Sequence, residues 1–188
     1  MRKRRRNWKK ISGKIVYKNP WIIIHEDKVL RPDGKVGMYG YLEKPVGVFT
    51  VVYDDKKDTV LFIRQHRYPI NKVILEIPAG VSENGNYLDE AKRELYEETG
   101  IKAKVWKHLG GAFVASGHES TRIEVFLAME LIRKEAKISH QESDEAIAEM
   151  VELRLVDLPD YIMDGKIECS LALTSLNYFF MWKKKNRQ

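Results

Sequence analysis

The 188-residue chain is 44% hydrophobic and 32% charged, a composition typical of a soluble globular protein with a substantial core. Its single cysteine, Cys169, excludes an internal disulfide and a cysteine-based zinc site, and fits a reducing compartment. The longest uncharged run, residues 169–182, is shorter than the ~20 residues of a membrane span, so we expect a cytoplasmic protein with no membrane partner.

The positive charge is concentrated at the two ends of the chain. The net charge is +6, but residues 1–10 contain seven Lys or Arg and residues 183–188 contain four. The rest of the chain therefore carries 22 basic and 27 acidic side chains. A nucleic-acid binder places its basic residues on a folded surface that follows the phosphates. We interpret both ends as solvated basic tails and expect no nucleic-acid partner, although Trp8 lies within the first tail.

Residues 11–45 have the pattern of a small antiparallel β-unit. Asn19-Pro20 separates two β-rich stretches, and RPDG at residues 31–34 is a strong turn signal between strands. Residues 46–182 then alternate predicted strands with a central and a terminal helix, which is typical of one α/β domain. The terminal helix has an apolar stripe that we interpret as core.

The central helix is predicted within residues 76–101, EIPAGVSENGNYLDEAKRELYEETGI. Asn86 is placed to cap its start, and Gly100 stands where a left-handed C-terminal cap is expected. An inward stripe at helical spacing is formed by Leu88, Ala91 and Leu95.

Three glutamates of this helix lie on one face. Glu94, Glu97 and Glu98 are three and four residues apart, a spacing at which like charges repel. A hard divalent cation such as Mg²⁺ would convert this repulsion into coordination, because it prefers carboxylate oxygens. The alternative is an acidic, solvated helix face.

Residues 93–101, RELYEETGI, resemble the REUxEExGU end of the Nudix box, where U is a bulky aliphatic residue. Gly80 resembles the glycine that opens the box. Two features depart from it: Asn86 replaces the usual glutamate, and six residues instead of seven separate that position from Arg93. In the family this glutamate mainly holds the loop and the box arginine. We therefore expect Arg93 to pair with Glu97 or Asp89.

The resemblance implies a Nudix-type α/β/α sandwich on a mixed sheet, preceded by the small antiparallel β-unit at residues 11–45. It also implies a divalent cofactor, Mg²⁺ or alternatively Mn²⁺. The ligands carried over from the family are the carbonyl of Ala79 and the carboxylates of Glu94, Glu97 and Glu98, of which Glu97 also counts as a catalytic candidate.

Two further stretches resemble the ADP-ribose pyrophosphatase and nucleoside diphosphate sugar hydrolase branch of this family. RQHRYP at residues 64–69 resembles its RQYRYP stretch, in which the residue matching Arg67 holds the diphosphate; Arg64 is a weaker second candidate. Residues 115–120, ASGHES, resemble the substrate-side SPGxSDE loop, which assigns Ser116 and Gly117 to substrate binding. A surface ion pair is the alternative for Arg67.

The same branch swaps its N-terminal β-unit across a homodimer and sandwiches the adenine base between aromatic side chains. Trp21 and Tyr39 match that pair by position, although core or interface packing would also explain both. Glu76, which precedes the box glycine, matches a residue that reaches the metal-bound waters, although it could be an ordinary strand residue.

The general base is expected from the acidic segment 139–149. EMVELRLV at residues 149–156 resembles the strand EFIEVxWV of the branch, which places the catalytic glutamate at Glu149, with Glu145 as the alternate. His118 has a pKa range suited to the role, but a single loop histidine is more often incidental.

Together these features predict a Mg²⁺-dependent hydrolase that cleaves the diphosphate of a nucleoside diphosphate sugar, with ADP-ribose giving AMP and ribose 5-phosphate. The alternatives are a preference for another sugar nucleotide such as GDP-mannose, action on capped or triphosphorylated RNA, and a regulator that binds ADP-ribose without cleaving it.

Overall fold

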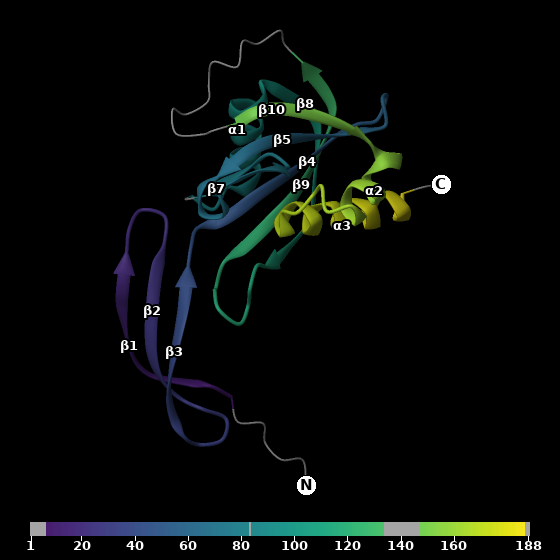
Figure 1. Ribbon diagram of the computed structural model, residues 1–188. Coiled ribbons are helices and arrows are strands. Elements are labelled where there is room, and N and C mark those ends of the chain that lie inside the picture. Colours follow the sequence, from purple (N-terminus) through teal and green to yellow (C-terminus); the bar gives the residue numbers. More distant parts are fainter. Residues whose placement is uncertain (1–6, 83, 134–146, 187–188) are drawn as a thin grey trace. The chain divides into compact units, whose positions relative to one another are not determined.

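A computed structural model of the chain describes residues 7–82, 84–133 and 147–186 (Figure 1). The chain divides into two compact units. The first, unit 1, comprises Met1–Pro45 and Phe113–Arg122, and the second, unit 2, comprises Val46–Ala112 and Ile123–Gln188.

Unit 1 contains a three-stranded antiparallel sheet in the order β1-β2-β3, as the sequence predicts. The strands are β1 (Lys9–Lys18), β2 (Ile23–Leu30) and β3 (Val36–Glu43). Gly34 ends the predicted turn between β2 and β3 with φ 86°, a conformation that favours glycine. Strand β1 begins at Lys9, so regular structure extends into the basic N-terminal end.

The loop 113–122 belongs to unit 1 because its backbone is hydrogen-bonded to β3. The Leu42 N–H donates to the His118 carbonyl at 2.9 Å, and the Ser120 N–H donates to the Leu42 carbonyl at 2.9 Å. These two bonds place residues far apart in the sequence beside the same strand.

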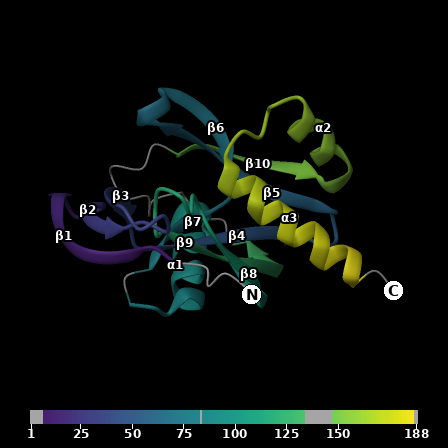
Figure 2. The ribbon, with the colours of Figure 1, turned by 90° about the horizontal axis from the view of Figure 1, so that it is seen from below.

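Unit 2 is built on a seven-stranded mixed sheet (Figure 2). Its main order is β10-β5-β4-β9-β8, with β6 paired to β5 and β7 paired to β4; β4 and β9 are parallel. The strands are β4 (Val46–Asp54), β5 (Thr59–Arg67), β6 (Lys72–Glu76), β7 (Ala79–Ser82), β8 (Ile101–Phe113), β9 (Arg122–Arg133) and β10 (Ile147–Arg154).

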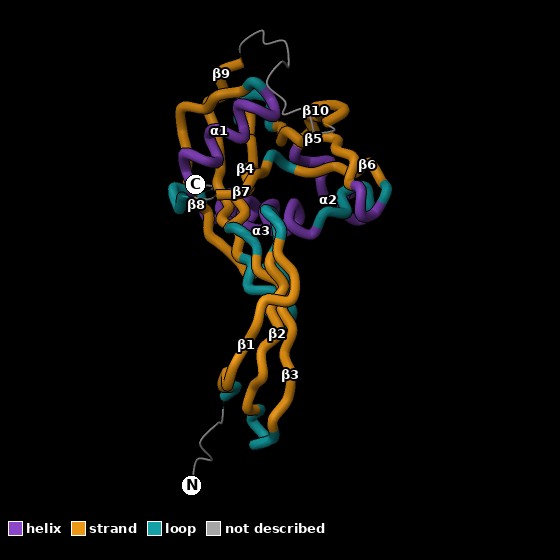
Figure 3. Tube along the Cα trace, turned by 90° about the vertical axis from the view of Figure 1, so that its left-hand side faces the viewer, coloured by secondary structure: helices purple, strands orange, loops and turns teal. Residues whose placement is uncertain are grey.

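Helices cover both faces of this sheet, as the predicted sandwich requires (Figure 3). Helix α1 (Tyr87–Thr99) packs its Leu95 with Val52 and Leu61. Helix α3 (Ser170–Lys185) packs its Phe179 against Tyr53, which neighbours Val52 and therefore points to the opposite face. The short helices η1 (Tyr68–Ile70), η2 (Leu155–Asp157) and α2 (Leu158–Met163) complete the unit.

The sheet splits along β5, and this split positions the helix with the acidic face. Strand β4 pairs with β5 only over Val52–Asp54, whereas its first half, Val46–Phe49, pairs with β7. Strand β10 pairs with β5 along Thr59–Gln65, whereas β6 takes the place of β4 beside Ile63–Arg67. Strand β7 therefore lies beside β4 and beneath α1.

Of the two predicted caps of α1, the C-terminal one is confirmed and the N-terminal one is not. Gly100 caps the C-terminus with φ 69°, and its N–H donates to the Tyr96 carbonyl at 2.8 Å. The predicted cap by the Asn86 side chain is wrong: its amide donates to the Asp89 carboxylate instead of accepting a backbone N–H.

Helix α3 continues three residues beyond the boundary predicted at residue 182. The reason is that Lys183 reaches the β4–β5 hairpin, where its ammonium contacts the Tyr53 hydroxyl and lies 2.9 Å from the Asp58 carboxylate. Within the described residues, none of the helices combines the length and apolarity needed to cross a membrane.

Candidate active site

Two of the three glutamates on the acidic face of α1 are buried. Glu94 is 9% exposed and Glu98 is 2% exposed, while the Glu97 side chain is partly exposed. A solvated acidic face is therefore the wrong interpretation for Glu94 and Glu98. Because a buried carboxylate is costly unless it is paired or binds a metal, these two positions call for a specific role.

The buried carboxylates lie against the backbone that opens β7. Glu98 Oε2 accepts a hydrogen bond from the Ala79 N–H at 3.1 Å. The Glu94 side chain lies so close to Gly80 that a Cβ added there would be 2.1 Å from the Glu94 carboxyl carbon. Only glycine fits at position 80 without displacing Glu94, which gives the glycine of the motif a physical reason in this chain.

Arg93 joins the carboxylates of α1 into one cluster. Its Nε donates to Glu90 at 3.0 Å, its Nη2 contacts Glu90 and Glu94, and its Nη1 contacts Glu97. These partners, Glu90 first, raise the pKa of Arg93. The predicted Glu97 pairing is confirmed. The Asp89 alternative is wrong, because Asp89 contacts Asn86 and Lys92.

These residues fit a divalent cation by their chemistry and by their shared helix face. Two buried carboxylates and one partly exposed carboxylate are the ligands that a hard cation prefers. Glu98 also contacts Ala79, whose carbonyl is the other predicted ligand. Among the described residues, no group of three His, Cys, Asp or Glu side chains already converges to hold a metal. Instead, the guanidinium of Arg93 now bridges Glu94 and Glu97.

Arg67 and Glu76 form an ion pair at the end of the split in the sheet. Arg67 donates through Nε at 2.9 Å and Nη2 at 2.6 Å to one oxygen of Glu76, which is 7% exposed. The Cys169 thiol is beside this pair: burial raises its pKa, and the charge of Glu76 adds to the effect. The two residues predicted to act on the diphosphate and its cation are thus brought together.

The predicted general base is placed elsewhere. Glu149 lies opposite Arg64 in the β5–β10 register and forms an ion pair with it at 3.1 Å. Arg64 and Arg67 are three residues apart, so their side chains point to opposite faces of β5. The structure therefore does not bring Glu149 to the face of Arg67 and Glu76. The alternate, Glu145, lies outside the described residues.

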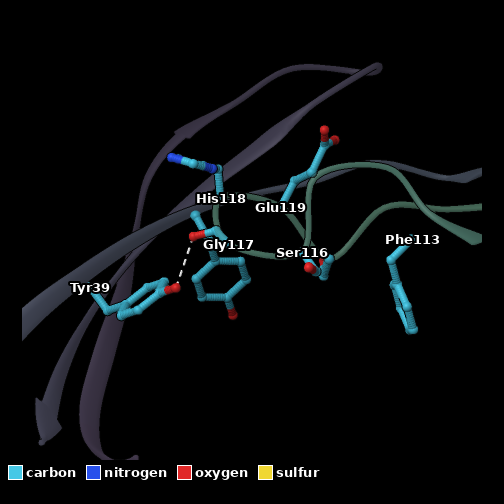
Figure 4. Close-up of a pocket in the computed structure, with 8 residues that line it drawn as sticks. Tyr39, Phe113, Ser116, Gly117, His118 and Glu119 are labelled. Carbon is cyan, nitrogen blue, oxygen red and sulfur yellow. Dashed lines mark hydrogen bonds between the residues drawn. The ribbon is translucent and has the colours of Figure 1, made fainter. Parts of the chain in front are cut away.

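Unit 1 contains a pocket of about 350 Å³ with aromatic walls. Tyr39, Tyr41 and Phe113 line it together with the loop at residues 116–120. Figure 4 shows the Tyr39 hydroxyl donating to the Gly117 carbonyl, at 2.8 Å. In the same view the side chains of His118 and Glu119 point away from the aromatic rings.

The sequence predicted part of this pocket. Tyr39, Ser116 and Gly117 line it, whereas Trp21 lies outside its lining and is 70% exposed. The aromatic neighbour of Tyr39 is Trp8, at 5.3 Å between ring centroids. Tyr41 and Phe113 were not predicted. Tyr39 and Tyr41 are two residues apart, which puts both rings on one face of the strand, and this spacing could have indicated Tyr41.

Comparison with protein families assigns both parts of the chain. A model described as the nucleoside diphosphate sugar hydrolase N-terminal domain matches residues 8–42, and the NUDIX domain model matches residues 43–169. The chain therefore belongs to the Nudix family, and it is a Nudix hydrolase.

Individual relatives agree with this assignment. The chain is 32% identical to an ADP-ribose pyrophosphatase of Bacillus subtilis over 81% of its own length and 80% of that protein. It is 26% identical to a methanol dehydrogenase activator of Bacillus methanolicus, over 90% of this chain and 91% of the relative. A crystal structure of an ADP compounds hydrolase matches 99% of this chain and all of the other with a TM-score of 0.83; at 17% identity this match shows the fold.

Proposed function

We propose that this Nudix hydrolase cleaves the diphosphate bond of a nucleoside diphosphate sugar, and that ADP-ribose, giving AMP and ribose 5-phosphate, is its leading substrate. The observation that carries the proposal is the burial of Glu94 and Glu98 against the Ala79–Gly80 backbone. A helix face built only for stability would not bury two carboxylates beside each other. The similarity to an ADP-ribose pyrophosphatase supports the choice of substrate.

Glu94, Glu97, Glu98 and the Ala79 carbonyl would hold the divalent cation, Mg²⁺ or alternatively Mn²⁺. When bound, such an ion offsets the negative charge of the phosphoryl oxygens and lowers the pKa of a coordinated water. The carboxylates supply the oxygen ligands that this charge requires. Glu97, which is partly exposed and held by Arg93, is the ligand best placed to change partners during turnover.

Arg67 would bind the diphosphate. A guanidinium has more donors than one carboxylate oxygen can accept, so Arg67 can contact phosphate oxygens while Glu76 fixes its orientation. Glu76 would in turn accept hydrogen bonds from water around the cation. The pairing of Arg67 with a buried carboxylate favours a fixed clamp over a mobile surface arginine.

A glutamate from residues 145–149 would take the proton of the attacking water. For Glu149 to act as this base, its ion pair with Arg64 must open, because that pair holds Glu149 on the opposite face of β5 from Arg67. Glu149→Gln and Glu145→Gln distinguish the two, because only loss of the true base should lower kcat and flatten its acidic pH limb.

The aromatic pocket of unit 1 would bind the base. Tyr39 and Tyr41 present flat faces on which any nucleobase can stack, and Ser116 and Gly117 close the pocket. We also propose that the three-stranded sheet pairs with a second copy of the chain, with Trp21 contributing to base binding from that surface. Its exposed apolar side chains support this, since a monomer rarely leaves such a set uncovered: Trp8, Ile11, Ile15, Tyr17, Trp21, Val36 and Met38.

The test is to incubate the purified protein with ADP-ribose, GDP-mannose, a dinucleoside polyphosphate and 5′-triphosphorylated RNA, each with Mg²⁺ and with EDTA. We expect metal-dependent release of AMP and ribose 5-phosphate from ADP-ribose at the highest kcat/KM. Faster cleavage of GDP-mannose would make GDP-mannose the preferred substrate instead of ADP-ribose. Binding of ADP-ribose without cleavage of any substrate would mean that the protein is a sensor and does not catalyse hydrolysis.

A further inference from the structure

The side chain that anchors Arg93 is Glu90, in the first turn of α1. Glu90 receives the Nε of Arg93 at 3.0 Å and also its Nη2, whereas Glu97 receives only Nη1. The Glu90 side chain is only 20% exposed, less than that of Glu97 at 31%. Glu90 therefore holds the guanidinium by its Nε–Nη2 edge, and Nη1 remains for Glu97.

Asn86, at the position where the Nudix box carries a glutamate, does not contribute to this anchor. Its amide contacts Asp89 one turn along the helix, and Asp89 in turn contacts Lys92. A neutral amide also cannot offset the charge of a guanidinium. The chain thus replaces a loop partner for Arg93 with one from the same helix, three residues before it.

This arrangement has a consequence for the proposed cation ligands. Arg93 contacts Glu94 and Glu97 at the same time as Glu90. While Glu90 holds the guanidinium, Arg93 keeps an orientation in which it contacts both Glu94 and Glu97. Without that partner, the Arg93 Nε and Nη2 donors that now bind Glu90 could make additional hydrogen bonds to Glu94 or Glu97, and these would compete with a cation for the carboxylate oxygens.

We propose that Glu90 is a positioning residue for hydrolysis: by holding Arg93 it orients Glu94 and Glu97 for the cation. The inference rests on the proposed function, because it assigns a role toward the cation that Glu94 and Glu97 would hold. Glu90 itself acts only through Arg93. Residues of this kind, which orient ligands without binding the metal, typically change metal affinity or activity by about 10- to 100-fold when replaced.

The test compares Glu90→Gln with Asp89→Asn. Both substitutions remove one negative charge from the first turn of α1 and keep the shape of the side chain, but only Glu90 contacts Arg93. Mn²⁺ binding to the free protein is measured by electron paramagnetic resonance, kcat and KM are measured with ADP-ribose, and Tm is measured without metal. We expect Glu90→Gln to raise the Mn²⁺ Kd and lower kcat, each about tenfold, with KM within about twofold.

Asp89→Asn should match the wild type in Mn²⁺ affinity and kcat. Equal effects of the two substitutions, or a Glu90→Gln variant with unchanged Mn²⁺ affinity, would overturn the inference. A general structural role predicts instead that the loss in Mn²⁺ binding follows a loss in Tm. If the wild type binds Mn²⁺ but cleaves no sugar nucleotide, the proposed substrate fails while the Mn²⁺ comparison still decides the role of Glu90.

Discussion

The two candidate binding regions are built in opposite ways. Around α1 in unit 2, charged groups are buried: Glu98 is 2% exposed, and Glu94 lies beneath a glycine with no room for a side chain. In unit 1 the pocket is formed by aromatic rings around a loop, and its polar contact is a tyrosine hydroxyl on a backbone carbonyl. The first arrangement suits charge-dependent chemistry, and the second suits binding of a flat base. Substitutions in the first should therefore lower kcat, and substitutions in the second should raise KM.

The largest expected effect is that of Glu98→Gln. The substitution keeps the hydrogen-bonding shape beside the Ala79 N–H but removes the buried charge. We expect kcat to fall by at least about 100-fold, equivalent to about 2.7 kcal/mol of barrier. Tm without metal should stay the same or rise, because a buried carboxylate is costly to the folded state.

A Glu98→Gln enzyme with near wild-type kcat would reject the assignment of α1 as the catalytic helix. A fall in kcat accompanied by a fall in Tm would mean that Glu98 supports the fold instead. The control is Glu43→Gln, at a partly exposed carboxylate of unit 1, which should leave kcat unchanged.

An intermediate effect is expected from Gly80→Ala, with Gly117→Ala as the matched substitution in the other region. A Cβ at position 80 would overlap the Glu94 side chain at 2.1 Å, whereas a Cβ at position 117 meets nothing within 4 Å. Displacing Glu94 should lower kcat at least about tenfold, and overpacking should lower the free energy of unfolding by about 1–3 kcal/mol. Gly117→Ala should leave the free energy of unfolding unchanged.

Urea unfolding and steady-state kinetics on both variants decide this prediction. Equal stability of the two variants would mean that Glu94 can move away from Gly80 at little cost. In that case the close approach between them would not explain why the chain has a glycine there.

The sequence predicted the α1 region more completely than the pocket, and the reason is the range of the contacts. The helix, its Gly100 cap and its three glutamates follow from residues within one or two turns of each other. The burial of Glu94 and Glu98 depends on β7, which only the fold places beneath them. Glu90 was missed as the partner of Arg93, because the motif directs attention to position 86 and because Asp89, four residues before Arg93, also has helical spacing.

The pocket depends on contacts that no local pattern contains. Tyr39 and Gly117 are 78 residues apart, and their hydrogen bond forms only because the loop 113–122 is tied to β3. Phe113, the last residue of β8, lines the pocket from a different part of the chain again. Similarly, the ion pair between Arg64 and Glu149 follows from the register of β5 and β10, which the sequence of either strand alone does not fix.

The smallest effect should come from the pocket itself. Tyr41→Ala removes an aromatic wall, and stacking of a base is worth about 1–3 kcal/mol, so KM for ADP-ribose should rise about tenfold while kcat changes less than about threefold. Tyr41→Phe keeps the ring and should restore KM. The same substitutions should leave the cleavage of a diphosphate substrate without a base unaffected, because the α1 carboxylates remain intact. A loss confined to kcat would instead connect the pocket to the chemical step, and the contrast between a region for charge and a region for the base would no longer hold.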